Sequence, residues 1–530
     1  MATNYILVQI DGQPLDEFSE NVLLESVDVV QEINKHWWCY IVCRQTEDQR
    51  FPIEDSLGKD LQVITYDEDG NETYLFSGMV LDAELEYEIY GSYTARLKGV
   101  SKTYNMDVAP TQQYYDYGDN NLKNVATQTL AGAGLNPNGD LKDTEFPLAL
   151  VQWGETDFNF LVRVADDVFQ FLCPNPENAD QVDVKSSFDD GPTLEWRTEN
   201  QLLSFRLRGR LRTPSMDGAH YNPWEGLSQD YSEVKGGPSF LDGAGPMVAK
   251  VKEQSGAKIT SGYVIDRRTV KELSHYQALL GREMNRAIET GVIGQGASLN
   301  PAVRAGNKVV IQGVDKVDGS FGVTKVIHHW KPTGYSNEFW CTASSEYRNE
   351  TRPKSNPWYG VVIGRVTDNN DPAKLGRIRV QYFWQVAGQA FWARMMTPHA
   401  GHERGIFFLP EIGDEVVVAF EDGDPERPII LGCLWNKPDT PPVEDFWGGE
   451  YENDDVKRIV TKSGHRIQLV DKNGKESIVI ATPTHIKVAM IENTDENGRP
   501  TLLLHSDGDI ILDAGGRIHC KSAFFSREVG

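Results

Sequence analysis

The sequence has few basic residues for its length. Its 530 residues contain 52 Lys and Arg but 78 Asp and Glu, which gives a formal net charge of −26 at pH 7. The imbalance is greatest in residues 1–110, where 21 acidic residues stand against seven basic ones. Binding to nucleic acid or to an anionic membrane requires the opposite balance, because phosphates must be neutralised. We therefore expect no nucleic-acid partner and no stable membrane anchoring.

Long apolar runs and a signal peptide are also missing. No apolar stretch approaches the ~18 residues that a membrane-spanning helix needs. The first residues, MATNYILVQIDG, lack the basic start and the apolar core of a leader. We expect synthesis and assembly in the cytoplasm, with export by a route that uses no cleaved leader.

Cysteine is scarce and scattered. The six cysteines include no CxxC pair, which is the spacing typical of zinc and redox sites. Cys39 and Cys43 lie four residues apart in a strand-like run, on one face but too far apart for an easy bridge. We expect reduced, mostly buried thiols.

Motifs for catalysis are absent. The sequence contains no GxSxG, no P-loop and no GxGxxG after a strand. His399 and His402 form an HxxH pair, but it falls in a loop and lacks the glutamate of a helical HExxH site. His328 and His329 fall in a strand, so their rings face opposite ways. We expect no catalytic residue, no metal site and no cofactor, and therefore no enzyme.

Short alternating runs fill residues 358–442. Two of them place apolar residues at every second position: Ile378, Val380 and Tyr382, then Val416, Val418 and Phe420. This alternation predicts half-buried strands. About five short strands in one small region predict a closed barrel of the oligonucleotide/oligosaccharide-binding (OB) type, here over 358–437.

The residue identities in this region point to a particular protein family more specifically than the alternation does. Four runs closely resemble the OB domain of the VgrG proteins: DPAKLG (371–376), PEIGD (410–414), EVVVAF (415–420) and DGDPERP (422–428). VgrG proteins are the spikes of type VI secretion and related contractile injection systems, and are kin to the hub and spike of contractile phage tails. A generic OB barrel is the alternative.

The N-terminal part resembles the phage-hub-like part of the same family more loosely. The segment from Gln152 to Arg163 resembles the family's Q-x-x-E-[ST]-D-F-x-x-x-x-R motif, although Phe169–Phe171 departs from the more usual Gly-Ile-aromatic run. The resemblance implies tandem barrels with smaller modules between them. The expected borders are hub barrel 1 at 1–103, a mixed α/β module at 104–200, and hub barrel 2 at 201–350 with a helical insertion at about 216–290. The longest helical candidate is 266–290.

Two helices are predicted in the mixed module from apolar spacing and capping residues. Asp119 or Asn120 is expected to cap the first, which ends at Gly134. Its inward positions are Leu122, Val125, Ala126, Thr129, Leu130 and Ala133. Thr156 or Asp157 is expected to cap the second, with Phe160, Leu161 and Val164 inward.

A row of carboxylates marks the strand-like run Leu81–Ile89. Asp82, Glu84, Glu86 and Glu88 alternate there with apolar residues. Neighbouring like charges repel, so this face must meet water or a basic partner. We expect either a solvated face or, as the sharper hypothesis, the surface that docks on an inner tube or baseplate.

After a Pro/Gly/acid-rich linker at 438–455 the chain becomes repetitive. Apolar residues two apart recur between turns that mostly contain Gly: Ile467/Leu469, Ile478/Ile480, Ile486/Val488/Met490, Leu502/Leu504 and Ile510/Leu512. So few inward side chains per strand make a thin core, which neighbouring copies must complete. The run TKSGHRIQLVDKNGKESIVI resembles the opening turns of the family's needle. We predict an intertwined trimeric β-prism over 456–530, with a small monomeric sandwich as the alternative.

The C-terminal residues 517–530 carry conspicuous apolar side chains. Ile518, Phe524 and Phe525 either fold back as a self-cap or, as the resemblance implies, dock a tip protein of the PAAR-repeat type. The predicted fold class is mainly β with α+β insertions, comprising phage-hub-like tandem barrels, an OB barrel and the trimeric prism.

The resemblance covers nearly the whole chain and implies a function. It implies a homotrimeric, non-enzymatic spike that connects a hexameric inner tube and baseplate to a tip protein and pierces the target envelope. The alternative is an exported β-rich carbohydrate-binding or hydrolase protein. Such a protein would normally show a leader and a cleft with paired carboxylates.

Overall fold

The computed structural model describes most of the chain. The described residues are 5–46, 51–67, 70–87, 92–116, 121–139, 141–142, 149–196, 202–211, 216–219, 232–234, 249–251, 253–254, 262–265, 291–343, 347, 357–385, 390–442, 455–492, 499–519 and 521. The chain divides into two compact units, Met1–Gly432 and Cys433–Gly530. Each unit is described by itself.

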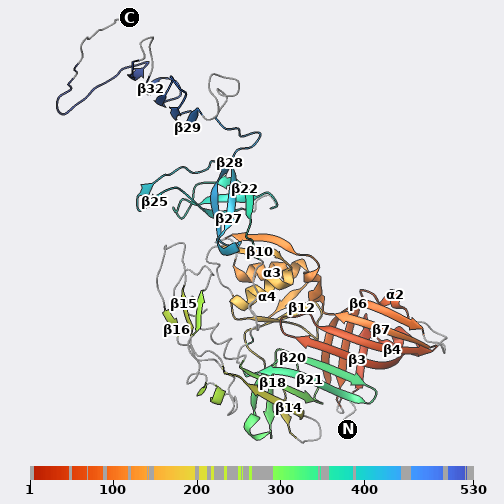
Figure 1. Cartoon of the computed structure of the whole chain (residues 1–530). Helices are drawn as coiled ribbons and strands as arrows, with labels where there is room; N and C mark the ends of the chain where they lie inside the picture. Colours follow the sequence, from red (N-terminus) through yellow and green to blue (C-terminus); the bar gives the residue numbers. More distant parts are fainter. Residues whose placement is uncertain are drawn as a thin grey trace. The chain divides into compact units, whose positions relative to one another are not determined.

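A thirteen-stranded sheet dominates the first unit (Figure 1). Its strands follow the order β14-β18-β21-β20-β3-β4-β7-β6-β5-β1-β2, and β19 pairs with both β20 and β13. The bounds are β1 Tyr5–Ile10, β2 Gln13–Pro14, β3 Leu23–Glu32, β4 Trp38–Thr46, β5 Asp60–Tyr66, β6 Glu72–Tyr87, β7 Ser92–Val100, β13 Thr193–Glu195, β14 Leu202–Gly209, β18 Val292–Ser298, β19 Lys308–Gln312, β20 Gly319–Lys331 and β21 Gly334–Thr342. Two one-turn helices, α1 (Leu15–Phe18) and α2 (Ile53–Ser56), interrupt its N-terminal part.

This sheet joins the two segments that the sequence predicts as separate hub barrels. β20 and β3 pair antiparallel, with Lys325 opposite Glu32, and the Nζ of Lys325 lies 3.2 Å from a carboxylate oxygen of Glu32. Side chains from both segments fill one apolar core, whose largest fully buried members include Trp37, Phe76 and Phe321. Each such burial stabilises the fold by about 1.5–3 kcal/mol. The borders at 103, 201 and 350 stay predictions.

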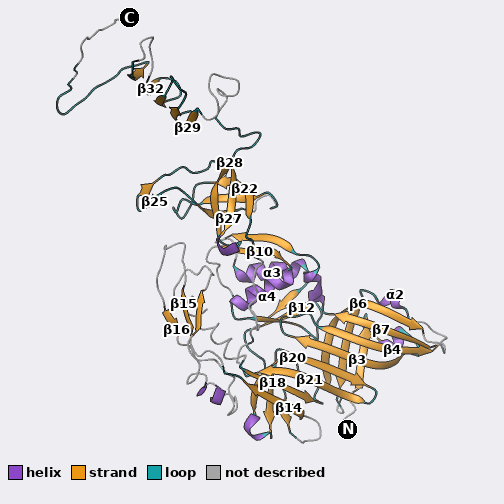
Figure 2. Ribbon diagram, viewed as in Figure 1, coloured by secondary structure: helices purple, strands orange, loops and turns teal. Residues whose placement is uncertain are grey.

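A mixed module with its own core follows. It contains α3 (Leu122–Gly132) and α4 (Asp157–Asp167), which lie beside β10 (Ala149–Glu155) (Figure 2). β10 pairs with β8 (Thr111–Asp116). A second small sheet has the order β11-β12-β9, with bounds Phe171–Pro174, Gln181–Lys185 and Asn136–Asn138.

The helices agree with the sequence except at one cap. The buried residues of α3 are five of the six predicted: Leu122, Val125, Ala126, Thr129 and Leu130. Its cap is Asn121, whose side chain accepts the N–H of Asn124, so the prediction of Asp119 or Asn120 is wrong. Several Asx residues precede the helix, and only the one directly before the first helical residue can reach that N–H. Gly134 follows with φ of +75°, and Thr156 caps α4 as predicted.

A small three-stranded sheet lies in the predicted insertion. It has the order β16-β15-β17, with bounds Ser232–Val234, Met216–Ala219 and Gly262–Ile265. The predicted helix 266–290 lies outside the described residues.

Five strands close into the OB barrel, in the order β22-β23-β24-β28-β27. Their bounds are β22 Val361–Asp368, β23 Ile378–Tyr382, β24 Phe391–Met395, β27 Glu415–Phe420 and β28 Pro428–Leu434. The six inward residues predicted for β23 and β27 are all buried. The alternation and the barrel are therefore confirmed. A short hairpin of β25 (Ala400–Gly401) and β26 (Arg404–Gly405) leaves the barrel between β24 and β27.

The DPAKLG run is a loop organised by Asp371. The carboxylate of Asp371 accepts backbone N–H groups of Ala373, Leu375 and Arg377, and the Nη2 of Arg377 lies 2.8 Å from it. Gly376 follows with φ of +71°, which favours glycine. Burial alone would raise the pKa of Asp371, but the guanidinium of Arg377 and the N–H groups outweigh it and lower the pKa to about 2.

The second unit contains a five-stranded antiparallel meander, β29-β30-β31-β32-β33. The bounds are β29 Val456–Val460, β30 Arg466–Val470, β31 Ser477–Ala481, β32 Ile486–Ile491 and β33 Thr501–Ser506. Four of the five predicted strands are confirmed, and β29 was not predicted. The strand expected around Ile510 and Leu512 is wrong for the single chain, because residues 507–519 adopt no strand. Alternating apolar and polar residues are compatible with a strand, but a strand also needs a neighbouring strand for its backbone hydrogen bonds, and the alternation does not provide one.

Candidate assembly surfaces

Two apolar rows cross the C-terminal sheet. The strand registers align Ile459, Ile467, Ile480, Val488 and Leu504 in one row, and Leu469, Ile478, Met490 and Leu502 in the next. Apart from the half-buried Val488, these side chains are between 42% and 64% exposed. We call these nine residues the apolar rows. So many contiguous aliphatic side chains facing outward are unusual for a monomer.

The opposite face of this sheet holds a small core. Val479, Ala481 and Ala489 are buried there, and Ile491 packs against them. The sequence predicted the large apolar residues as the inward ones of a trimeric prism; in the single chain they lie on the exposed face, and the prism stays a prediction.

The predicted tip residues are only partly described. Ile518 is 53% exposed and lies in irregular chain. Ile511 nearby is 82% exposed. Phe524 and Phe525 lie outside the described residues.

The acidic row lies on β6, beside basic side chains of its own sheet. Asp82, Glu84 and Glu86 are exposed as the alternation predicts, and Glu88 lies outside the described residues. On the neighbouring strand β7, Lys98 stands opposite Asp82 and Arg96 opposite Glu84. The Nη2 of Arg96 lies 2.9 Å from a carboxylate oxygen of Glu86. An exposed ion pair of this kind contributes about 0–1 kcal/mol, so the row is partly neutralised inside the chain.

Each residue of the Q-x-x-E-T-D-F motif has a structural task. The Nε2 of Gln152 donates to the carboxylate of Asp157 at 2.7 Å, and the side chain of Thr156 caps α4. Phe158 is buried and its ring lies 4.2 Å from that of His36. Asp157 also accepts the hydroxyl of Thr111 from β8. The motif therefore fixes how β10 leads into α4.

The last residue of the motif, Arg163, is a buried cation. Its Nη2 lies 2.6 Å from Glu155 and donates to the carbonyl of Val151 at 2.7 Å. Its Nη1 lies 3.5 Å from Glu426 of the OB region, which also accepts the N–H of Val151. Burial would lower the pKa of Arg163, but Glu426 and Glu155 outweigh it and keep it charged. The sequence placed Arg163 in the motif but gave no sign of its distant partner.

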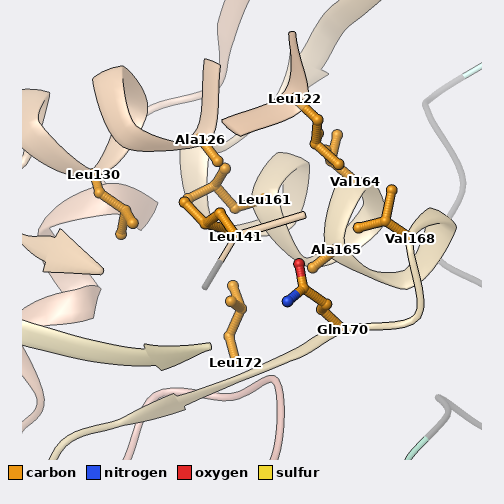
Figure 3. Close-up of a pocket in the computed structure, with 10 residues that line it drawn as sticks. All are labelled: Leu122, Ala126, Leu130, Leu141, Leu161, Val164, Ala165, Val168, Gln170 and Leu172. Carbon is orange, nitrogen blue, oxygen red and sulfur yellow. The ribbon is translucent and has the colours of Figure 1, made fainter. Parts of the chain in front are cut away.

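A small apolar gap lies between α3 and α4 (Figure 3). The residues that line it are Leu122, Ala126, Leu130, Leu141, Leu161, Val164, Ala165, Val168, Gln170 and Leu172. The only polar one, Gln170, is engaged, because its Oε1 accepts the N–H of Lys142 at 3.0 Å. The space open to a water-sized sphere is about 10 Å³, which is too small for an organic ligand. It is a packing gap.

The histidines singled out from the sequence do not meet in one site. His328 is buried and its Nδ1 lies 2.6 Å from the hydroxyl of Tyr335, whereas His329 reaches Asp28 on the other face. His399 directly precedes the exposed strand β25, and His402 directly follows it. Across the described ranges, no group of three or more His, Cys, Asp or Glu side chains could hold a metal ion. None of the helices in this described part has the length and apolarity needed to cross a bilayer.

Comparison with known proteins identifies the OB region. Residues 362–435 match the type VI secretion system/phage-baseplate injector OB domain. The chain is 26% identical over 215 residues to the actin cross-linking toxin VgrG1 of Vibrio cholerae, covering 36% of this chain and 19% of that protein. It is 31% identical over 121 residues to the type VI secretion system spike protein VgrG5 of Pseudomonas aeruginosa, covering 21% of this chain and 15% of that protein. The aligned segments thus span a fifth or less of these relatives.

A solved structure has a similar fold. It is a component of the type VI secretion system of Escherichia coli, described as structurally similar to tail proteins of bacteriophage T4. The match has a TM-score of 0.55 at 15% identity and covers 81% of this chain and 99% of that one. The resemblance to the VgrG spike proteins and the mainly β, phage-tail-like fold with an OB barrel are thus confirmed.

Proposed function

We propose that this chain is the spike of a contractile injection apparatus, non-enzymatic and active as a homotrimer. In this proposal its hub part connects a hexameric inner tube and baseplate to a shaft that pierces the target envelope. The particle is assembled in the cytoplasm and the spike leaves as part of it. The observation that carries the proposal is the pair of apolar rows on the C-terminal sheet.

The free energy available from burying the apolar rows favours association with further copies of the chain. Burying one such side chain fully contributes about 1.5–3 kcal/mol, and these are already about half covered, so each supplies about 1 kcal/mol on association. Nine residues per chain therefore supply about 9 kcal/mol per chain, which is comparable to the roughly 4–15 kcal/mol of translational and rotational freedom that a chain loses on association. Closed cyclic symmetry covers all copies of the surface at once.

The mass of the purified chain in solution tests the trimer. Light scattering at micromolar concentration should give about three times the chain mass of 59.5 kDa. Ile480→Asp places a charge in the middle of an apolar row and should lower the mass toward that of one chain. Asn473→Asp adds the same charge to an exposed turn of the same sheet and should leave the trimer intact. A wild-type mass of one chain would refute the proposal.

Docking on the tube or baseplate is proposed for the acidic row. Changing Asp82, Glu84, Glu86 and Glu88 to Gln should weaken assembly gradually, and more at low salt, because exposed charges are screened. Since Arg96 already pairs with Glu86 and each exposed charge contributes little, no single position should dominate. Unchanged sheath–tube assembly at low and physiological salt would leave the row a solvated face.

Tip binding is proposed for Ile518, Phe524 and Phe525. Deleting 515–530 should leave the trimer intact and abolish binding of a PAAR-type tip protein, together with injection. Retention of the tip protein in a pull-down with the truncated spike would place the docking surface elsewhere.

A further inference from the structure

The large sheet contains an unbroken antiparallel run that begins at β14 and reaches β6 (Figure 1). The run consists of eight strands in the order β14-β18-β21-β20-β3-β4-β7-β6, and every pairing in it is antiparallel. Because the number of strands is even, β14 and β6 run in opposite directions. Cyclic symmetry repeats strand directions from copy to copy, so β6 of one copy can meet β14 of the next in antiparallel orientation.

Both of these strands have an open edge over part of their length. β5 pairs only with Glu72–Met79 of β6, and Val80 exchanges backbone hydrogen bonds with the residues just before β5. From Asp82 to Tyr87, β6 pairs only with β7 among the described residues. From Ser204 onward, β14 pairs only with β18 in that same part of the chain. An open edge presents unpaired N–H and C=O groups, which can take up a further strand.

The two open edges match in where their apolar side chains point. Ala83 and Leu85 of β6 pack against the apolar core of the sheet, and so do Phe205 and Leu207 of β14. The ring centroid of Phe205 lies 5.3 Å from that of Phe321 within this core. A sheet that continued from β6 into the β14 of a second copy would therefore keep one apolar face and one polar face.

The polar face carries acids at one open edge and bases at the other. On β6 these are the exposed members of the acidic row, and on β14 they are three exposed arginines, which we call the basic edge: Arg206, Arg208 and Arg210. Within the described ranges, the basic edge has no ion pair, and in the acidic row only Glu86 has one, with Arg96. Opposite charges on paired strands stabilise the pairing, whereas like charges weaken it.

The sheet already contains one seam of this kind. Where β20 meets β3, Lys325 stands opposite Glu32 and His329 opposite Asp28, with contacts of 3.2 Å and 2.7 Å. The later segment supplies the basic partners and the earlier segment the acidic ones. The strand registers place these pairs on the same face as the acidic row and Arg206. The division of charge within the chain is thus the one that the two open edges repeat.

We propose that the open edge of β6 pairs with the open edge of β14 in a second copy of this chain, with the acidic row opposite the basic edge. This inference rests on the homotrimer proposed above. A contact between two different edges is head-to-tail, so three such contacts close a ring and leave neither edge open. In the antiparallel register with Glu84 opposite Arg208, the other members of the row also face arginines.

Disulfide cross-linking of the full chain tests the pairing. Glu84→Cys is combined in turn with Arg206→Cys, Arg208→Cys and Arg210→Cys, which covers register shifts of two residues in either direction. Mild oxidation should give linked dimers and trimers on a non-reducing gel, and most with Arg208→Cys, because a disulfide needs Cα atoms about 4.4–6.8 Å apart. Each single variant should remain one chain and controls for the exposed Cys433.

Light scattering on the wild type separates this inference from the proposed function. A wild-type mass of one chain would refute the homotrimer itself. A trimeric mass, with no cross-link from any of the three pairs of cysteines, would overturn the seam alone.

Charge reversal tests the attraction across the seam. Arg206→Glu with Arg208→Glu, or Asp82→Lys with Glu84→Lys, brings like charges together. Either double variant should lower the hydrogen-exchange protection of both strands in the trimer by about tenfold. The fourfold variant restores opposite charges and should recover the wild-type protection. Lys331→Glu, at an exposed end of the inner strand β20, should change nothing. If both double variants leave the protection unchanged and weaken only assembly on the tube, the row belongs to the tube surface and the seam is wrong.

Discussion

Asp371 gives a test of how the DPAKLG loop stabilises the OB barrel. Its carboxylate meets three backbone N–H groups and Arg377, and the side chain is 3% exposed. The pKa is lowered from 3.8 to about 2, which corresponds to roughly 2–3 kcal/mol of folding free energy at about 1.4 kcal/mol per pKa unit. Asp371→Asn should remove about this amount at pH 7, because it leaves the nearly buried Arg377 without its counter-charge.

The pH dependence of this contribution has a definite sign. Because the folded pKa lies below the unfolded one, the contribution is complete above about pH 4 and is lost as the pH falls towards about 2. Wild type and Asp371→Asn should therefore differ most near neutral pH and approach each other in acid. Hydrogen exchange of β23 and β27 in the full chain measures this, with the exposed Glu403→Gln as a control. A difference that does not depend on pH would refute the electrostatic reasoning.

Three other substitutions follow from packing and capping. Trp153 of β10 is 4% exposed and belongs to the same apolar cluster as the interior of the OB barrel. Trp153→Ala should therefore lower the local stability of the barrel by about 3–5 kcal/mol, seen as faster exchange in β24 and β27, and Trp153→Phe should restore part of it. Gly322→Ala should lower the melting temperature, since its Cβ would lie 2.4 Å from the ring of Phe188; Gly515→Ala, with nothing within 4 Å, should not. Asn121→Ala should cost about 1 kcal/mol through the lost cap of α3, measured by exchange of its first turn.

The sequence by itself determined the local structure of this protein. Alternation marked the buried residues of β23 and β27, and apolar spacing marked the buried face of α3, because periods of two and 3.6 follow directly from strand and helix geometry. The fixed Gly, Pro and Asp positions of the OB region reflect local requirements, such as those of the loop around Asp371. The resemblance to VgrG could therefore be recognised from the sequence without the structure.

Only the tertiary structure decided which surfaces meet. Arg163 and Glu426 are separated by 263 positions in the chain, and no local pattern links them. Nor did alternation reveal that β20 pairs with β3, or that the small residues around Ala489 rather than the rows of Ile and Leu face inward in one chain. Periodicity tells which side chains share a face, but long-range packing determines which surface covers that face. The described part of a single chain provides no surface that covers the apolar rows.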